Sequence, residues 1–150
     1  MCRAMSITTR KEIIMSRNRA WLAWVGALAV TVSAGAEDIK VTLTGDQEVP
    51  PVTTAAKGEG TITVAKDKTV SGAVTTSGVE AVAAHIHIAE AGKNGPPVIT
   101  LVKSGDNKWT TPAGAKLTEE QYQSFKAGHL YVNVHSAKNK AGEIRGQLKP

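Results

Sequence analysis

All four histidines of the chain lie in two short segments, residues 83–88 and residues 129–135. Apolar and polar residues alternate in both segments, which is typical of β-strands, because successive side chains on a strand point to opposite faces. Each segment therefore has an apolar face and a face with imidazoles, which are those of His85 and His87, and of His129 and His135. Neutral imidazole is the commonest metal ligand among side chains. The pattern predicts a metal site on the outward face of a sheet.

The donor atoms favour copper or zinc over magnesium or calcium. Several imidazoles without a thiolate or an evident ligating carboxylate suit these metals, and nitrogen sites hold copper(II) more tightly than zinc. We expect one copper ion bound by His85, His87 and His135, with His129 as the candidate for a fourth ligand and zinc as the alternative metal. Three imidazoles leave a coordination position open for a small molecule, whereas four tend to close it.

Three other side chains are expected beside the ligands: Glu143, Asn133 and Tyr131. If the final hairpin turns near Asn139, the opposed residues are His135 with Glu143, Asn133 with Arg145, and Tyr131 with Gln147. Directly opposed side chains on antiparallel strands are close enough to interact. We therefore expect the Glu143 carboxylate to orient the ring of His135.

The elements that carry these residues are predicted to be short strands. Alternating runs separated by turn residues occur at residues 39–44, 60–64, 69–75, 82–88, 98–102, 129–135 and 141–149. Such spacing predicts an all-β fold, an antiparallel Greek-key sandwich or barrel of about seven or eight strands. The apolar face of the first histidine strand would hold Val82, Ala84, Ile86 and Ile88.

One short helix is predicted before the second histidine segment. Thr118 and Gln121 have the spacing of a capping box, and Gly128 suits the C-terminal end of a helix. Tyr122 and Phe125 would share the side of the helix that packs on the sheet.

Residues 1–36 have the features of a secretory signal peptide. Arg17 and Arg19 precede an apolar run over residues 20–32, and Ala34-Gly35-Ala36 offers small residues for cleavage. The run is shorter than the ~20 residues that a membrane-spanning helix needs. Met15 would by itself begin a signal of ordinary length. We expect a periplasmic or secreted domain of residues 37–150 that is not held in the membrane after cleavage.

The composition of this mature segment excludes several classes of function. It carries 13 basic and 12 acidic residues, so neither nucleic acid nor an anionic membrane surface is an expected partner. The only cysteine, Cys2, lies in the leader, which rules out thiol catalysis and thiolate ligands in the mature domain. The carboxylates of Glu48, Glu90 and Glu143 form no acid–base pair that would indicate hydrolysis.

Five motifs in this order resemble the chordin-type (CHRD) domain: residues 43–51 (LTGDQEVPP), 84–87 (AHIH), 94–97 (NGPP), 127–136 (AG with YVNVHS) and 142–147 (GEIRGQ). The resemblance spans residues 39–148 and implies an exported β-sandwich domain, which occurs alone in many bacteria and is repeated in the animal protein chordin, an extracellular growth-factor antagonist.

The CHRD family is itself similar to the copper-zinc superoxide dismutases, which are Greek-key barrels with a His-x-His copper motif. This similarity implies that His85 and His87 form that pair, that His135 is the third ligand, and that Arg145 attracts the anion. The disulfide and the zinc-binding loop of those enzymes are not visible in this sequence, so the similarity extends to a copper site alone.

Three functions fit these features. The first is redox chemistry at the copper ion, with superoxide dismutation as the leading reaction. The second is a non-catalytic periplasmic copper carrier or buffer. The third is a structural or adhesion module that binds no metal. The expected partners are the metal ion and, for the first function, superoxide; a homo-oligomer is compatible with the pattern but is not indicated by it.

Overall fold

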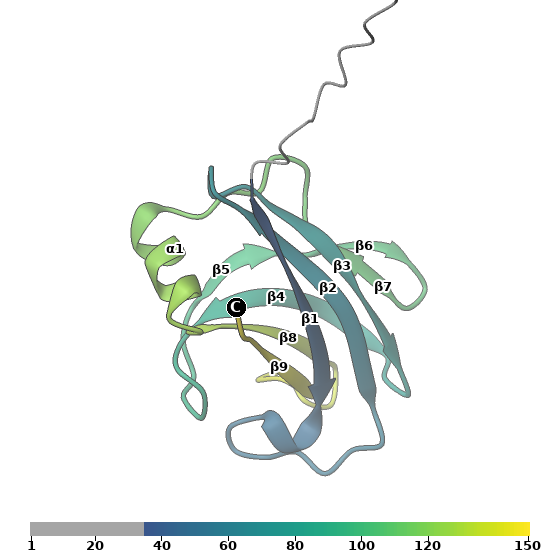
Figure 1. The fold of residues 1–150 in the computed structure, drawn as a ribbon. Helices are drawn as coiled ribbons and strands as arrows, with labels where there is room; N and C mark the ends of the chain where they lie inside the picture. Colours follow the sequence, from purple (N-terminus) through teal and green to yellow (C-terminus); the bar gives the residue numbers. More distant parts are fainter. Residues whose placement is uncertain (1–34) are drawn as a thin grey trace, which may run out of the picture. The chain divides into compact units, whose positions relative to one another are not determined.

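The structure is a computed structural model that describes residues 35–150, and these residues form an antiparallel β-sheet with one α-helix (Figure 1). The strands are β1 (Ala36–Thr44), β2 (Lys57–Ala65), β3 (Val70–Ser77), β4 (Ala81–Ile88), β5 (Pro97–Thr100), β6 (Val102–Gly105), β7 (Lys108–Thr110), β8 (Leu130–Ser136) and β9 (Ile144–Leu148). A 3-10 turn, η1 (Gly45–Gln47), follows β1, and the helix α1 (Glu119–Lys126) precedes β8. The predicted signal peptide lies almost wholly outside the described residues. Within residues 35–150, no helix has the length and apolar character needed to cross a membrane.

The strand order makes the sheet curl into a nearly closed barrel. The order is β5-β4-β8-β9-β1-β2-β3-β7-β6, and neighbouring strands are antiparallel. The two edge strands, β5 and β6, follow each other in the chain with only Leu101 between them, so the edges of the sheet must approach each other. The predicted all-β antiparallel fold with one helix is confirmed for the described residues. The nine strands exceed the expected number because β6 and β7 form an additional short hairpin.

Apolar side chains of the strands fill the interior of the barrel. Alternation along β1 buries Ile39, Val41 and Leu43 and leaves Lys40 and Thr42 between them exposed. The other fully or nearly buried members of this core include Ile62, Val64, Val70, Val74, Ala84, Ile86, Ile99, Leu101, Trp109, Leu117, Phe125, Leu130, Val132, Val134, Ile144 and Leu148. The core is therefore mostly aliphatic, as the scarcity of aromatic residues requires.

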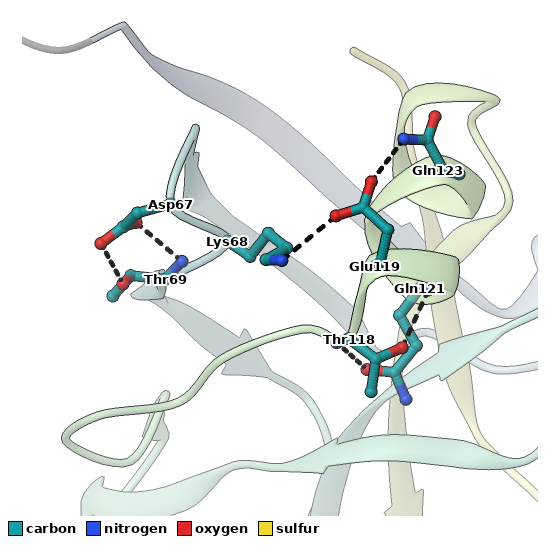
Figure 2. A network of polar contacts seen from close by, with 7 residues as sticks. All are labelled: Asp67, Lys68, Thr69, Thr118, Glu119, Gln121 and Gln123. Carbon is teal, nitrogen blue, oxygen red and sulfur yellow. Dashed lines mark hydrogen bonds and ion pairs between the residues drawn. The ribbon is translucent and has the colours of Figure 1, made fainter.

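The helix α1 begins and ends as its sequence predicts. The Thr118 hydroxyl accepts a hydrogen bond from the backbone nitrogen of Gln121 at 3.2 Å, and the Gln121 side chain accepts one from the backbone nitrogen of Thr118 at 2.9 Å (Figure 2). This capping box satisfies two donors that would otherwise lack partners at the first turn. Gly128, with φ of 74°, follows the last turn in the left-handed conformation that glycine adopts readily. Phe125 anchors the helix with an exposure of 1%.

A turn of the sheet also contacts the helix. The ammonium of Lys68, between β2 and β3, lies 3.1 Å from the carboxylate of Glu119 (Figure 2). Asp67 accepts hydrogen bonds from the backbone nitrogen and the hydroxyl of Thr69, at 3.0 and 2.9 Å, and so shapes the turn that presents Lys68. Exposed ion pairs contribute little to stability, so Phe125 rather than this pair holds the helix in place.

β8 is buried on both faces, which corrects the prediction of an outward histidine face. All residues of Leu130–Ser136 are buried. Two loops cover the polar face: the 45–56 loop between β1 and β2, and the 89–96 loop between β4 and β5. Asn133 of β8 donates to Glu48 of the first loop at 3.3 Å, and the Tyr131 hydroxyl accepts from the backbone of Gly95 in the second at 3.2 Å. The face of the sheet that carries the histidines therefore lies in a polar layer beneath these two loops.

A β-bulge at the start of β4 corrects the assignment of Val82 to the apolar face. The pairing of β4 with β8 shifts between Ala81 and Ala83, so the extra residue does not continue the alternation. Val82 turns outward with an exposure of 61%, whereas Ala84 and Ile86 remain fully buried.

The contact of β9 with β1 generates a prediction about Gly146. A Cβ atom at this position would lie 2.5 Å from the backbone oxygen of Thr42, a contact that only a backbone shift can relieve. We expect Gly146→Ala to lower the free energy of unfolding by about 1–3 kcal/mol, as overpacking does. Urea denaturation of the metal-free protein measures this change.

Gly105→Ala is the matched control for Gly146→Ala. Gly105 also lies in a strand, but the nearest atom to a Cβ there would be Lys108 Cβ at 3.7 Å, an ordinary contact. This substitution should change stability by less than about 0.5 kcal/mol. Equal effects of the two substitutions would contradict the close packing of β9 on β1.

Candidate metal centre

Three of the four histidines converge at one point of the sheet. β4 and β8 pair so that Ala83 lies opposite His135 and Asn133 opposite His85, which makes His135 the diagonal neighbour of His85. The ring centroids of His85, His87 and His135 are 4.9–5.8 Å apart. One ligand atom from each of the three lies within 4.8 Å of the others. These distances place three imidazoles where a single ion could contact all of them.

Hydrogen bonds to backbone carbonyls define which nitrogen faces this point. Nδ1 of His87 is 2.8 Å from the oxygen of Gly95, and Nδ1 of His135 is 3.0 Å from the oxygen of Lys140. A carbonyl oxygen can only accept, so each Nδ1 carries the proton and each Nε2 keeps a free lone pair. Metal-binding histidines commonly have such a second partner, because it fixes the ring and its tautomer.

The remaining nitrogens have the arrangement that a metal ion would satisfy. Nδ1 of His85 lies 3.0 Å from Nε2 of His135, so these two nitrogens face each other. Nε2 of His87 is buried and has no hydrogen-bond partner in the part of the chain that the structure describes. A buried polar atom without a partner is costly, and such atoms are rare in folded proteins. The donor set therefore fits a metal ion held by imidazole nitrogens.

Burial lowers the pKa of all three histidines below its usual value. The main cause is the loss of hydration, which disfavours the imidazolium form. The carbonyl of Gly95 partly opposes this lowering of the His87 pKa, and the carbonyl of Lys140 does the same at His135. The rings are therefore neutral at neutral pH, the form in which histidine binds metals.

His129 does not join the other three histidines. It lies outside the group whose nitrogens converge. Its backbone nitrogen donates to Ser124 of α1 at 2.9 Å, and its backbone oxygen accepts from Ala89 at 2.9 Å. His129 thus connects the helix, the start of β8 and the 89–96 loop through its backbone. Three imidazoles, unlike four, would leave one coordination position of a bound ion open to a small molecule.

Tyr131 packs directly on the histidine group. Its ring is stacked on His87, with 5.0 Å between centroids and 16° between planes. Its hydroxyl is 3.2 Å from the backbone nitrogen of Gly95, the residue that also bonds His87. The guanidinium of Arg145 lies over the same ring, 3.4 Å from its centroid. Tyr131 therefore separates His87 on β4 from Arg145 on β9.

Arg145 is a buried residue with an exposure of 1%. One guanidinium nitrogen donates to the backbone oxygen of Lys93 at 2.8 Å and lies 3.4 Å from the side-chain oxygen of Asn94. The other donates to the backbone oxygen of Glu90 at 3.4 Å and to the side chain of Gln147 at 3.2 Å. These partners hold the guanidinium under the 89–96 loop. The anion-attracting role stays a prediction, and the contacts indicate a structural task.

The predicted hairpin register is confirmed, but Glu143 has a different partner from the one expected. Asn133 lies opposite Arg145, and Tyr131 opposite Gln147. The Glu143 carboxylate accepts a hydrogen bond from the Thr54 hydroxyl at 2.8 Å. The backbone carbonyl of Lys140 orients the ring of His135 instead. The turn that follows β8 brings this carbonyl to Nδ1 of His135.

Glu48 is a site residue that the sequence reasoning missed. It comes from the 45–56 loop, has an exposure of 5%, and accepts a hydrogen bond from Asn133 at 3.3 Å. One oxygen of Glu48 and one of Asn133 have no hydrogen-bond partner among the described residues. Each of these two oxygens would lie 2.5 Å from a Cβ atom at Gly142. Burial raises the pKa of Glu48 to about 7, although the positive charge of Arg145 opposes this. Only its place in the 43–51 motif could have indicated it.

The raised pKa of Glu48 predicts a pH-dependent stability. Its pKa is about 7 in the folded chain against 4.5 as the ordinary value, so the folded state binds more protons between these values. The protonated Glu48 side chain therefore contributes to the free energy of unfolding, and this contribution is complete below about pH 4.5. It is lost as the pH rises through about 7, and it amounts to at most about 3 kcal/mol. Glu48→Gln should remove this loss, so the variant gains stability relative to wild type as pH rises.

Urea denaturation of the metal-free protein from pH 4.5 to 8 measures the difference between variant and wild type. The histidine contributions are common to both proteins and cancel. Glu59→Gln, on the exposed side of β2, controls for the removal of a carboxylate as such. A difference for Glu48→Gln that does not change with pH would contradict the assignment.

The comparison with protein families agrees with the resemblance that the five motifs of the sequence indicated. The family model of the CHRD domain matches residues 39–148, which is more than half of the chain. No curated protein and no solved structure matches the chain. The matched range runs from β1 through β9 and includes the histidine group, Glu48 and Arg145. The chain belongs to the CHRD domain family.

Proposed function

We propose that this chain is an exported copper-binding protein that holds one copper ion through His85, His87 and His135. The observation that carries the proposal is the buried Nε2 of His87, which has no hydrogen-bond partner among residues 35–150 although Gly95 fixes its ring. Nε2 of His135 is the second ligand, and Nδ1 of His85 is the third once the proton that it shares with His135 in the metal-free protein has moved to the other nitrogen of the His85 ring. Export rests on the signal-like residues 1–36.

The choice of copper follows from the donor chemistry. The converging group consists of imidazoles alone, without a carboxylate or a thiolate. Such sites bind copper(II) more strongly than zinc when both are available, with zinc as the alternative occupant. Bound copper would supply one-electron redox chemistry. The protein would contribute the neutral rings, the fixed tautomers of His87 and His135, and the covering loops that keep Tyr131 and Arg145 out of water.

Superoxide dismutation is the second candidate function, and one observation favours it. His85 is only partly buried, whereas His87 and His135 are buried, so the side of the centre at His85 is the most open to solvent. Three ligands also leave one position for a small molecule. A copper carrier needs an accessible ion as well, because the ion must be received and released. Turnover separates the two functions.

The first prediction of this proposal is that histidine substitutions differ sharply in their effect on copper binding. Wild type should bind about one equivalent of copper(II), measured by competition with a chelator of known affinity. His87→Ala should weaken copper binding by at least about 100-fold. Loss of a residue that only hydrogen-bonds a metal ligand typically lowers metal affinity by about 10–100-fold, and the loss of a ligand itself should cost more. His129→Ala is the matched control and should bind as wild type does.

Equal affinities of wild type and His87→Ala would contradict the assigned site. The affinity should also fall on acidification, since protons compete for the imidazoles. Because burial lowers the pKa of all three rings, the fall should begin below the ordinary histidine pKa of 6.5. Protein purified without a histidine tag avoids a competing site.

The second prediction concerns turnover by the copper-loaded protein. If the centre is catalytic, superoxide should disappear faster with loaded wild type than with the His85→Ala/His87→Ala double variant exposed to the same copper. A chelator too weak to strip the protein but able to bind free copper keeps the comparison specific. No acceleration by a protein that is shown to hold copper would reject dismutation and leave the carrier function.

A further inference from the structure

The ring of His87 depends on the position of the 89–96 loop. Its Nδ1 bonds the backbone oxygen of Gly95 near the end of this loop. The loop passes so close to β4 that a Cβ atom at Gly95 would collide with the backbone oxygen of Ile88. A displacement of the loop would therefore remove the only hydrogen bond that the described residues make to the His87 ring and free the ring to change tautomer.

Arg145 is the residue that holds this loop from below. Its guanidinium reaches the backbone oxygens of Lys93 and Glu90 and the side chain of Asn94, all within the loop. Gln147, its neighbour on the same face of β9, donates to the backbone oxygen of Ala89 at 3.0 Å. Asn94 in turn donates to the backbone oxygen of Val49 at 2.7 Å, which ties the two covering loops together.

A second connection from Arg145 to His87 passes through Tyr131. The guanidinium lies over the Tyr131 ring at 3.4 Å, and the same ring is stacked on His87. The Tyr131 hydroxyl also meets the backbone nitrogen of Gly95. The loop and the tyrosine thus constrain His87 from two directions, and Arg145 contacts both.

We infer that Arg145 is a positioning residue that fixes the orientation and tautomer of the His87 ring through the 89–96 loop and Tyr131. The inference rests on the proposed function in that His87 is taken as a metal ligand. It differs from a role in attracting anions, since that role needs only a positive charge, whereas this one needs the planar, forked shape of the guanidinium. Lysine keeps the charge but offers neither the two-pronged reach nor the same stacking on an aromatic ring.

The test compares Arg145→Lys with wild type in the metal-free protein and then with copper. In wild type, nitrogen NMR of the histidine side chains should show His87 protonated at Nδ1 alone. In Arg145→Lys, His87 should populate both tautomers, and the copper(II) dissociation constant should rise about 10–100-fold, as when other partners that orient a ligand are removed. Tautomer and affinity unchanged in a folded Arg145→Lys variant would overturn the inference.

Two adjacent loop residues supply a matched pair that does not disturb the core. Asn94 is exposed and contacts Arg145 and Val49 through its side chain. Lys93 contacts Arg145 through its backbone oxygen only, and its ammonium pairs with Glu90 at the surface. Asn94→Ala should therefore shift the His87 tautomer and weaken copper binding by about threefold or more, whereas Lys93→Ala should stay within about twofold of wild type.

The two measurements distinguish a failure of this inference from a failure of the proposed copper binding. If wild type binds no copper, the proposed function fails, while the tautomer of His87 in the metal-free variants still decides the inference. If Arg145→Lys does not fold, Asn94→Ala decides it alone. Equal effects of Asn94→Ala and Lys93→Ala would overturn the inference.

Discussion

The buried charge of Arg145 is the constraint on which the rest of the polar layer depends. A guanidinium removed from water is tolerated only when its donors meet acceptors, because an unpaired buried charge is very costly. Here the acceptors are mainly oxygens of the 89–96 loop. The loop must therefore lie on β9 and β8, and in that place it presents the Gly95 carbonyl to His87.

The same layer explains why β8 is buried on both faces. One face supplies Val132 and Val134 to the barrel core, and the other supplies Tyr131, Asn133 and His135 to a covered polar region. Most buried side-chain nitrogen and oxygen atoms in this layer have a hydrogen-bond partner among residues 35–150. The exceptions are Nε2 of His87 and one oxygen each of Glu48 and Asn133. Unsatisfied groups in an otherwise satisfied layer are commonly found where a protein binds or reacts.

Much of this arrangement could be predicted from local patterns, and the failures have definite causes. Alternation along a strand is a local property, so it correctly placed His85 and His87 on one face. The position of the turn near Asn139 is also local, and it correctly paired Asn133 with Arg145. The covering loops join residues far apart in the chain, such as Glu48 and Asn133, for which no local pattern exists. The partner of His135 is a backbone carbonyl, which every residue has, so side-chain chemistry suggested Glu143 instead.

The place of β1 in the sheet has a consequence for the time at which the chain can fold. β1 lies between β2 and β9, so the N-terminal strand of the domain has a free edge until the C-terminal strand is present. Pairings between such distant segments form slowly, because a long loop must close first. A chain whose β9 is still within the ribosome therefore lacks the strand that covers this edge of β1 and completes the barrel. The barrel can therefore be completed only after β9 has been synthesised, and not strand by strand during synthesis.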